Sequence, residues 1–179
     1  FDHPQNLLCT LYPLICWNAS DSKTKDYVLS CQSLNSADTI NYGGFADYPG
    51  GISSAETTFM ALVSLRLLGA LSVVNQTIVE HWLMNGYIAS KGLFYEEHLP
   101  NNRKTVNYGT GYSIASLEIL GRLGDIDRTV VASYLSSVQF TDGGWSGANC
   151  TDEPVDEIAD CYPVMLGLEQ LERVGAIRD

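Results

Sequence analysis

Side chains able to do acid–base or metal chemistry are sparse in this chain, and most of them gather in one acidic run. That run, TDEPVDEIAD at 151–160, places several carboxylates close enough together to hold a cation. A run of like charges is more typical of a solvated loop, and we interpret it as one. The histidines have no metal-ligand spacing, and no Ser/His/Asp or Cys/His arrangement is local in sequence, so we predict no catalytic residue; the histidines are His3, His81 and His98.

The five cysteines form no C-x-x-C pair, and their odd number leaves at least one outside any disulfide. Cys9 with Cys16, or Cys150 with Cys161, could be bridged, and the spacing does not choose between these pairs. Three N-x-S/T sequons fall in predicted loops, where a glycan could extend into solvent. A chain that begins at Phe1 also fits a processed, exported protein. We therefore predict an extracellular or cell-surface location, with the cytoplasm as the alternative, and glycosylation at Asn18, Asn75 and Asn149.

Composition excludes two classes of partner. The net charge is −11 and the pI about 4.5, whereas nucleic acids and anionic membranes are bound by basic surfaces. No apolar run approaches the roughly 18 residues that span a bilayer, so we predict no membrane insertion. The 179 residues, 45% of them hydrophobic and 17% charged, fit a single globular domain with a sizeable core.

The elements that must position these side chains repeat along the chain. Three apolar segments end in a glycine turn and an aromatic residue: Phe45, Phe94 and Trp145, which are 49 and 51 residues apart. Each aromatic residue is followed, after a loop, by a second apolar segment with leucines at a spacing of three, which is typical of one helical face. The pattern predicts an all-α array of three helical hairpins. We divide the chain into an amino-terminal segment with a short helix, 1–25, and one repeat domain, 26–179, with repeats at 26–75, 76–127 and 128–178.

The third turn, QFTDGGW, resembles a motif of known proteins. Gln139, Gly143 and Trp145 match the Q-x-x-x-G-x-W motif of the squalene and oxidosqualene cyclase family. The first repeat, YVLSCQ followed by GGFADYPGGISSAETTFMALVSLRLLG, resembles the β subunits of protein prenyltransferases. Both families share the α/α toroid, in which helical hairpins form an inner and an outer ring. The resemblance therefore implies that three hairpins build a partial or half toroid.

The motif has a structural role in these families, because its glutamine bonds a helix end while the aromatic ring packs over that end. Each turn then joins one hairpin to the next. By this resemblance we predict six structural joint residues here: Gln32, Phe45, Phe94, Gln139, Gly143 and Trp145.

The catalytic motifs of the two families are matched poorly. The cyclases use a D-x-D-D acid motif, which neither Asp125-Ile126-Asp127 nor Asp156-Glu157 reproduces. Prenyltransferases meet the prenyl diphosphate with a histidine and basic residues, and the matching positions here are Ser54, Glu153 and Asp156. Like charges would repel a diphosphate at such a site. The resemblance therefore does not extend to either family's reaction.

A zinc site is implied only in part. The prenyltransferases hold zinc through an Asp-x-Cys-Tyr segment and a later histidine, and Cys161-Tyr162 matches the Cys-Tyr. Ala159 stands at the aspartate's position, and Asp160 is displaced by one residue. A tetrahedral zinc site needs at least three protein ligands, so we expect no cofactor, with Cys161 and Asp160 as residual metal ligands in the alternative.

Three functions follow from these observations. An arc of three hairpins leaves its end faces uncovered, so we predict an extracellular repeat domain that binds or self-assembles, as a homo-oligomer formed through the repeat ends, rather than an enzyme. The first alternative is a fragment of a zinc-dependent prenyltransferase-like or terpenoid cyclase-like enzyme. The second is a binder of an apolar small molecule in a toroid cavity lined by residues such as Phe59, Tyr108 and Tyr112.

Overall fold

The helices of this chain alternate between an inner and an outer row. A computed structural model describes residues 6–17, 22–98, 106–141, 143–145 and 158–171. Apart from two-residue strands, the regular structure of these residues is helical, which confirms the all-α prediction. The elements are α1 Leu7–Trp17, α2 Ser22–Ser30, α3 Ala55–Leu67, the 3₁₀ helix η1 Leu71–Val73, α4 Gln76–Asn85, β1 Tyr87–Ile88, β2 Leu93–Phe94, α5 Val106–Ile119, the 3₁₀ helix η2 Leu123–Asp125, α6 Arg128–Ser137 and α7 Ile158–Gln170.

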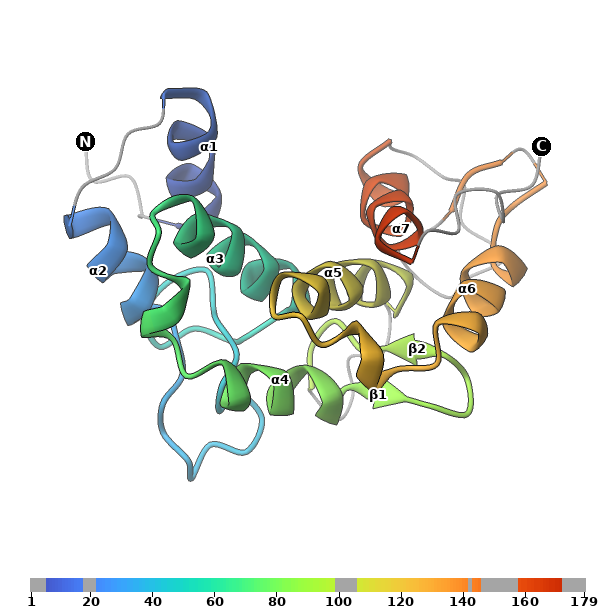
Figure 1. Cartoon of the computed structure of the whole chain (residues 1–179), viewed down its shortest axis with the longest axis horizontal. Helices are drawn as coiled ribbons and strands as arrows, with labels where there is room; N and C mark the ends of the chain where they lie inside the picture. Colours follow the sequence, from blue (N-terminus) through green and yellow to red (C-terminus); the bar gives the residue numbers. More distant parts are fainter. Residues whose placement is uncertain (1–5, 18–21, 99–105, 142, 146–157, 172–179) are drawn as a thin grey trace.

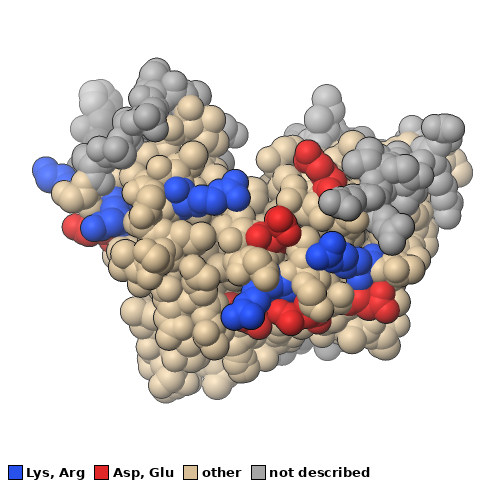
Figure 2. All heavy atoms as spheres, viewed as in Figure 1, with Lys and Arg blue, Asp and Glu red and all other residues tan. Residues whose placement is uncertain are grey.

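The inner row consists of α1, α3, α5 and α7, each of which contacts the next along the row (Figure 1). The outer helices α2, α4 and α6 contact α3, α5 and α7, respectively, so each outer helix and the inner helix after it form a hairpin. Strands β1 and β2 pair antiparallel, with Tyr87 opposite Phe94, in the connection between α4 and α5. The row is curved, and Figure 2 shows the surface hollowed between the parts formed by α1 and α7. The prediction of a half-toroid array is confirmed.

The inner helices α3 and α5 end in the same way. Gly69 and Gly121 follow their last turns with φ of +63° and +68°, a conformation that glycine adopts without steric cost. The next backbone N–H in each case returns to the last turn: Ala70 N donates to Leu65 O and Arg122 N to Leu117 O, both at 2.8 Å. A short 3₁₀ helix then leads to the next outer helix. The same C-terminal turn therefore sets the same hairpin geometry twice.

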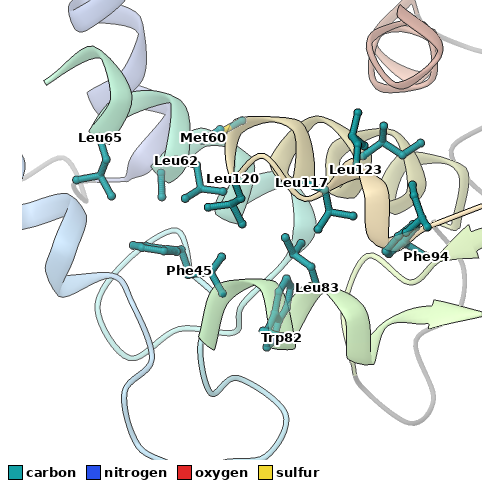
Figure 3. Packing of buried hydrophobic residues seen from close by; sticks show 14 of the residues in the cluster. Phe45, Met60, Leu62, Leu65, Trp82, Leu83, Phe94, Leu117, Leu120 and Leu123 are labelled. Carbon is teal, nitrogen blue, oxygen red and sulfur yellow. The ribbon is translucent and has the colours of Figure 1, made fainter. Parts of the chain in front are cut away.

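The hydrophobic core lies between the two rows. Figure 3 shows Leu62 and Leu117 of the inner helices on the side of Leu83 and Trp82 of α4, with Leu65 farther along α3 on the side of Phe45. The leucines that align between repeats are completely buried, as their spacing predicts; they are Leu65, Leu117 and Leu168. Burying a leucine stabilises the folded state by roughly 2 kcal/mol relative to leaving it exposed. The core therefore holds each inner helix against the outer row.

Helices α5 and α7 approach each other unusually closely. A Cβ added at Gly111 of α5 would overlap the carbonyl group of Pro163 in α7. On the other side of the contact, a Cβ at Gly167 would lie 3.1 Å from the Gly111 Cα. The absence of side chains at these two positions lets the helix backbones touch. None of the helices described has the length and apolar character needed to cross a bilayer.

Candidate functional site

The predicted joint residues lie in tight turns that follow the outer helices. Gln32 Nε2 donates to Gly43 O at 3.2 Å, and Gln139 Nε2 donates to Gly143 O at 2.8 Å. The acceptor is therefore the carbonyl of the turn glycine, whereas the resemblance predicted a bond to a helix end. Because the glutamine side chain spans the turn, it fixes the direction in which the chain leaves the helix.

The turn glycines contact the outer helix of the next hairpin. Gly43 has φ of +100° and lies against the backbone of Ile78 in α4, where a Cβ would overlap the carbonyl. Gly92 has φ of +68° and lies against Val130 in α6, where a Cβ would be 2.6 Å from the carbonyl oxygen. Trp82 of α4 adds a hydrogen bond from its indole Nε1 to Ile40 O at 2.8 Å. These contacts support the prediction that the turns tie successive hairpins together.

The inner helices meet the same turns through side chains at equivalent positions. Thr58 and Thr110 each lie seven residues before an aligned leucine. The Phe45 N–H donates to Thr58 Oγ1 at 3.1 Å, and the Phe94 N–H donates to Thr110 Oγ1 at 2.9 Å. Both phenylalanine rings are completely buried. Each joint therefore connects an outer helix, a turn and an inner helix.

Cys161 occupies the corresponding position in the third hairpin, seven residues before Leu168. Its thiol donates to the Trp145 carbonyl, with an S–O distance of 3.9 Å. The side chain therefore contacts the third joint, as the threonines contact the first two. A metal-binding role for Cys161 stays a prediction, and the Asp160 side chain lies outside the described part.

The described residues do not fit a zinc site. In the described ranges no group of three or more His, Cys, Asp or Glu side chains could hold a metal ion. Cys9, Cys31 and Cys161 are free thiols, so neither disulfide considered from the sequence is present. Cys9 and Cys16 are seven residues apart in α1, which separates them by about 10 Å along the helix axis, farther than a disulfide reaches.

The opposite side of the inner helices faces the hollow. Two residues along an α-helix turn the side-chain direction by about 200°. Glu56, two residues before Thr58, and Tyr108 and Tyr112, two residues on either side of Thr110, therefore point away from the joints. The Tyr108 hydroxyl donates to Glu56 Oε1 at 3.3 Å, so side chains from equivalent positions of neighbouring repeats meet. Helices α3 and α5 thus run parallel and in register.

Four aromatic side chains form a continuous inner aromatic wall on α3, α5 and α7. The ring centroids of Phe59 and Tyr112 are 5.3 Å apart, and those of Tyr108 and Tyr112 are 5.0 Å apart in an edge-to-face arrangement. Tyr162 of α7 lies 6.5 Å from Tyr112 and is 54% exposed. Such rings offer a large apolar surface, with hydroxyl groups for polar contacts.

Two carboxyl groups lie at the amino end of α3, beside the inner aromatic wall. Ser54 caps this helix, with its Oγ accepting from Thr57 N at 3.1 Å. Glu96, from the loop after β2, supplies two further acceptors: its carbonyl oxygen accepts from Ala55 N at 2.9 Å and its Oε1 from Glu56 N at 3.0 Å. The favourable interaction of an acceptor with a helix amino end explains the position of Glu96.

Burial governs the protonation of both carboxyl groups. It raises the pKa of Glu96 to about 8; the hydrogen bond from Glu56 N lowers that pKa, while the Glu56 carboxylate raises it. Burial also raises the pKa of Glu56, and the hydrogen bond from Tyr108 opposes that shift. Neutralising buried carboxyl groups avoids the cost of desolvating their charges. The amino end of α3 therefore holds a proton near neutral pH.

Glu96 is expected to make the stability pH-dependent. The folded chain keeps this proton up to about pH 8, whereas a free carboxyl releases it near 4.5. The stabilisation is thus fully present below about pH 4.5 and is lost as the pH rises to about 8, by about 1.4 kcal/mol per unit at most. Glu96→Gln keeps an acceptor for Glu56 N without the charge. In urea unfolding, the free energy of unfolding of Glu96→Gln should decline less between pH 4.5 and 8 than that of the unchanged chain, and the variant should be the more stable protein at pH 9. An equal decline in both proteins would contradict the raised pKa of Glu96.

Three residues at these sites were not identified from the sequence. Trp82 had no recognised motif, and Glu96 was one acidic residue among many. The sequence assigns no role to His98, whose ring stacks on Trp82 with centroids 4.3 Å apart, and burial lowers its pKa to about 4. Gly86 leaves room for this ring, because a Cβ there would lie 2.7 Å from His98 Nε2, and the sequence contains no signal for that contact.

The predicted glycosylation positions are only partly described. Asn75 is exposed at the start of α4, and its side chain makes no capping hydrogen bond. Asn18 and Asn149 lie outside the described residues. Modification of all three stays a prediction.

Known proteins resemble the chain over most of its length. The geranylgeranyl transferase type-1 subunit beta of Arabidopsis thaliana is 27% identical over 150 residues, which cover 75% of this chain and 36% of that protein. Candida albicans protein geranylgeranyltransferase-I complexed with GGPP has a TM-score of 0.66 at 13% identity, covering 94% of this chain and 53% of that one. The second match shows the fold alone. The chain thus spans about a third and about half of these two proteins, respectively.

These relatives correct two expectations. The prediction of an extracellular repeat domain that binds or self-assembles is wrong, because the homologous protein is a geranylgeranyl transferase subunit. The extracellular or cell-surface location is wrong for the same reason, and the cytoplasmic alternative is consistent with the relatives. The sequons misled because the three-residue pattern arises in loops of any protein and by itself carries no information about export.

The repeats and the three joints lie within the match to one family model. The family model described as "Prenyltransferase alpha-alpha toroid domain" matches residues 7–157, which include α1 to α6 and the three joints. That range covers most of the chain and begins at the first inner helix. This chain therefore belongs to the prenyltransferase α/α toroid domain family.

Proposed function

We propose that this chain is part of the β-type subunit of a protein prenyltransferase and that its inner aromatic wall holds an apolar isoprenoid chain. The observation that carries the proposal is the continuous contact of Phe59, Tyr108, Tyr112 and Tyr162 on the hollow side. Family membership supports it, as does the relative whose name specifies transfer of a geranylgeranyl group. An apolar binder in a toroid cavity, one of the functions inferred from sequence, is included in this proposal.

The chemistry of the wall favours the hydrocarbon part of such a ligand. Aromatic rings and a long apolar chain both gain from leaving water, by roughly 25 cal/mol per Å² of surface buried. In contrast, Glu56 and Glu96 at the end of the wall would repel a diphosphate when they are ionised. We therefore assign affinity to the isoprenoid chain and place no diphosphate contact on these described residues.

A second, different subunit is the partner that we propose. The relative from Arabidopsis thaliana is named a beta subunit, which supports a partner of another kind rather than a second copy of this chain. Outside the inner aromatic wall, α7 also exposes an apolar side chain, Met165, which is 39% exposed. Copurification of the full-length protein with a distinct second chain would support the assignment, and a stable homodimer with no other subunit would oppose it.

Tyr112→Ala tests the isoprenoid site. Tyr112 is 5% exposed and contacts the other three rings of the wall, so its removal should weaken binding of geranylgeraniol about tenfold or more. Tyr112→Phe keeps the ring and should retain most of the affinity. Isothermal titration with geranylgeraniol and with geranylgeranyl diphosphate measures both variants.

The matched control is Tyr48→Ala, because Tyr48 is 58% exposed in a loop that does not belong to the wall. Its affinity for geranylgeraniol should equal that of the unchanged chain. Equal losses for Tyr48→Ala and Tyr112→Ala, or no measurable binding by the unchanged chain, would reject the wall as the isoprenoid site.

A further inference from the structure

The acidic end of the inner wall has one oxygen atom without a partner. Glu96 is 9% exposed, and its Oε1 accepts the Glu56 N–H at 3.0 Å, but its Oε2 is buried with no hydrogen-bond partner. Capping of α3 accounts for the first oxygen and not for the second. When Glu96 is ionised, this oxygen is a buried acceptor, and leaving it unsatisfied costs about 1–3 kcal/mol, so a donor that reached it would be bound favourably.

Among the described residues, no cation compensates the charge of the two carboxyl groups. Of the residues that the structure describes, those whose ionisable groups act on Glu56 are Asp47, Tyr108 and Tyr112, and those that act on Glu96 are Glu56 and Glu97, all acidic or phenolic. Throughout the described ranges, neither carboxyl forms an ion pair. Arg66, the basic residue of α3, lies ten residues beyond Glu56, which corresponds to about 15 Å along the helix axis. Within the described part of the chain, the negative potential at this end is therefore balanced only by the amino end of α3.

We propose that Glu56 and Glu96, together with the rings of Tyr108 and Tyr112, form a binding site for a cationic nitrogen group, the ammonium or guanidinium of a basic side chain on a polypeptide. Such a group donates hydrogen bonds to carboxylate oxygens and is also attracted to the face of an aromatic ring. It would supply the donor that Glu96 Oε2 lacks. The choice of a polypeptide as the source rests on the proposed function in protein prenylation, whereas the cation site rests on the geometry alone.

Protonation gives this site a signature that a purely structural role lacks. The carboxyl groups attract a cation when they are ionised, and burial raises the pKa of both. Affinity should therefore increase as the pH rises toward and through about 8, and the site should release protons when it binds its ligand near neutral pH. Asp47 also raises the pKa of Glu56, and Glu97 raises the pKa of Glu96, so both neighbours add to the effect of burial.

Titration with a short capped peptide tests the site. The probe contains three lysines, and its control has the same sequence with acetylated lysines. We expect the lysine peptide to bind at least tenfold more tightly at pH 8.5 than at pH 6, and we expect proton release that isothermal titration detects as a dependence of the heat on buffer. Lysine amide tests whether a small amine binds as well as a peptide does. Weaker binding of lysine amide than of the lysine peptide supports a polypeptide as the ligand, and equal binding refutes the choice of a polypeptide.

Glu56→Gln and Glu96→Gln should each reduce affinity for the lysine peptide at pH 8.5 about tenfold and diminish the pH dependence. Glu118→Gln is the matched control, because Glu118 is exposed on α5 at the far end of that helix. Three results would overturn the cation site: binding of the acetylated peptide as tight as that of the lysine peptide, an unchanged affinity in both Glu56→Gln and Glu96→Gln, or an equal loss of affinity in Glu118→Gln. Geranylgeraniol binding measured on the same variants separates the two hypotheses, because loss of peptide binding alone leaves the isoprenoid proposal intact.

Discussion

Gly111→Val should lower the free energy of unfolding by about 3 kcal/mol or more, because it forces atoms into a filled contact between two helices. Already the first added carbon, the Cβ, would overlap the Pro163 carbonyl in α7. The obstacle is backbone, so no side-chain rotation relieves it, and α7 must move away from α5. That movement would also separate Tyr162 from Tyr112. Urea unfolding followed by circular dichroism measures the loss.

Gly124→Ala is the control for this substitution. Gly124 lies in η2, and a Cβ there would meet no atom within 4 Å. The free energy of unfolding should change by less than about 0.5 kcal/mol, as for most surface substitutions. If Gly111→Val were as mild as Gly124→Ala, the close approach of α5 and α7 would not exist in solution.

Trp145→Ala should reduce the free energy of unfolding by about 3–5 kcal/mol, the range typical of removing a large buried aromatic side chain. Trp145 is 2% exposed, and its indole Nε1 donates to Leu135 O at 2.8 Å. The alanine variant loses both the packed ring and the hydrogen bond that joins the third turn to α6. Thermal and urea unfolding of the two proteins measures the difference.

Trp145→Phe separates the two contributions. It keeps most of the ring and leaves the Leu135 carbonyl without the indole donor, so it should cost less than the alanine substitution. Tyr48→Ala, on an exposed side chain, controls for the loss of an aromatic residue as such. A change below about 1 kcal/mol for Trp145→Ala would indicate an exposed ring, in conflict with a joint at this position.

The sequence contains the repeat because local patterns encode it. The turns at Phe45, Phe94 and Trp145 each require a glycine and a buried ring, and the helices after them require a leucine stripe. Such patterns depend on residues close together in the chain. For this reason the hairpins, their order and the buried leucines could be predicted without coordinates.

The acidic end of the wall could not be predicted in the same way. Glu56 and Glu96 are 40 residues apart and meet only because the loop after β2 passes the start of α3. Neither residue has a local motif, and the pKa of Glu96 depends on burial that arises from tertiary packing. The position of Cys161 was visible as a spacing of seven from Leu168, but the corresponding threonines acquired meaning only when they were seen to bond the joints.

The order of contacts along the inner row, from α1 to α3, α5 and α7, has a consequence for how the fold changes in size. Because each helix is held mainly by its immediate neighbours, stability approximates a sum over adjoining pairs, as it does in repeat proteins generally. Disruption of one pair of neighbouring helices then leaves the other pairs largely in place. Because stability is a sum over adjoining pairs, duplication of the segment that encodes one hairpin adds a hairpin without changes in the existing ones. The curvature of the arc and the width of its hollow can therefore evolve by one hairpin at a time.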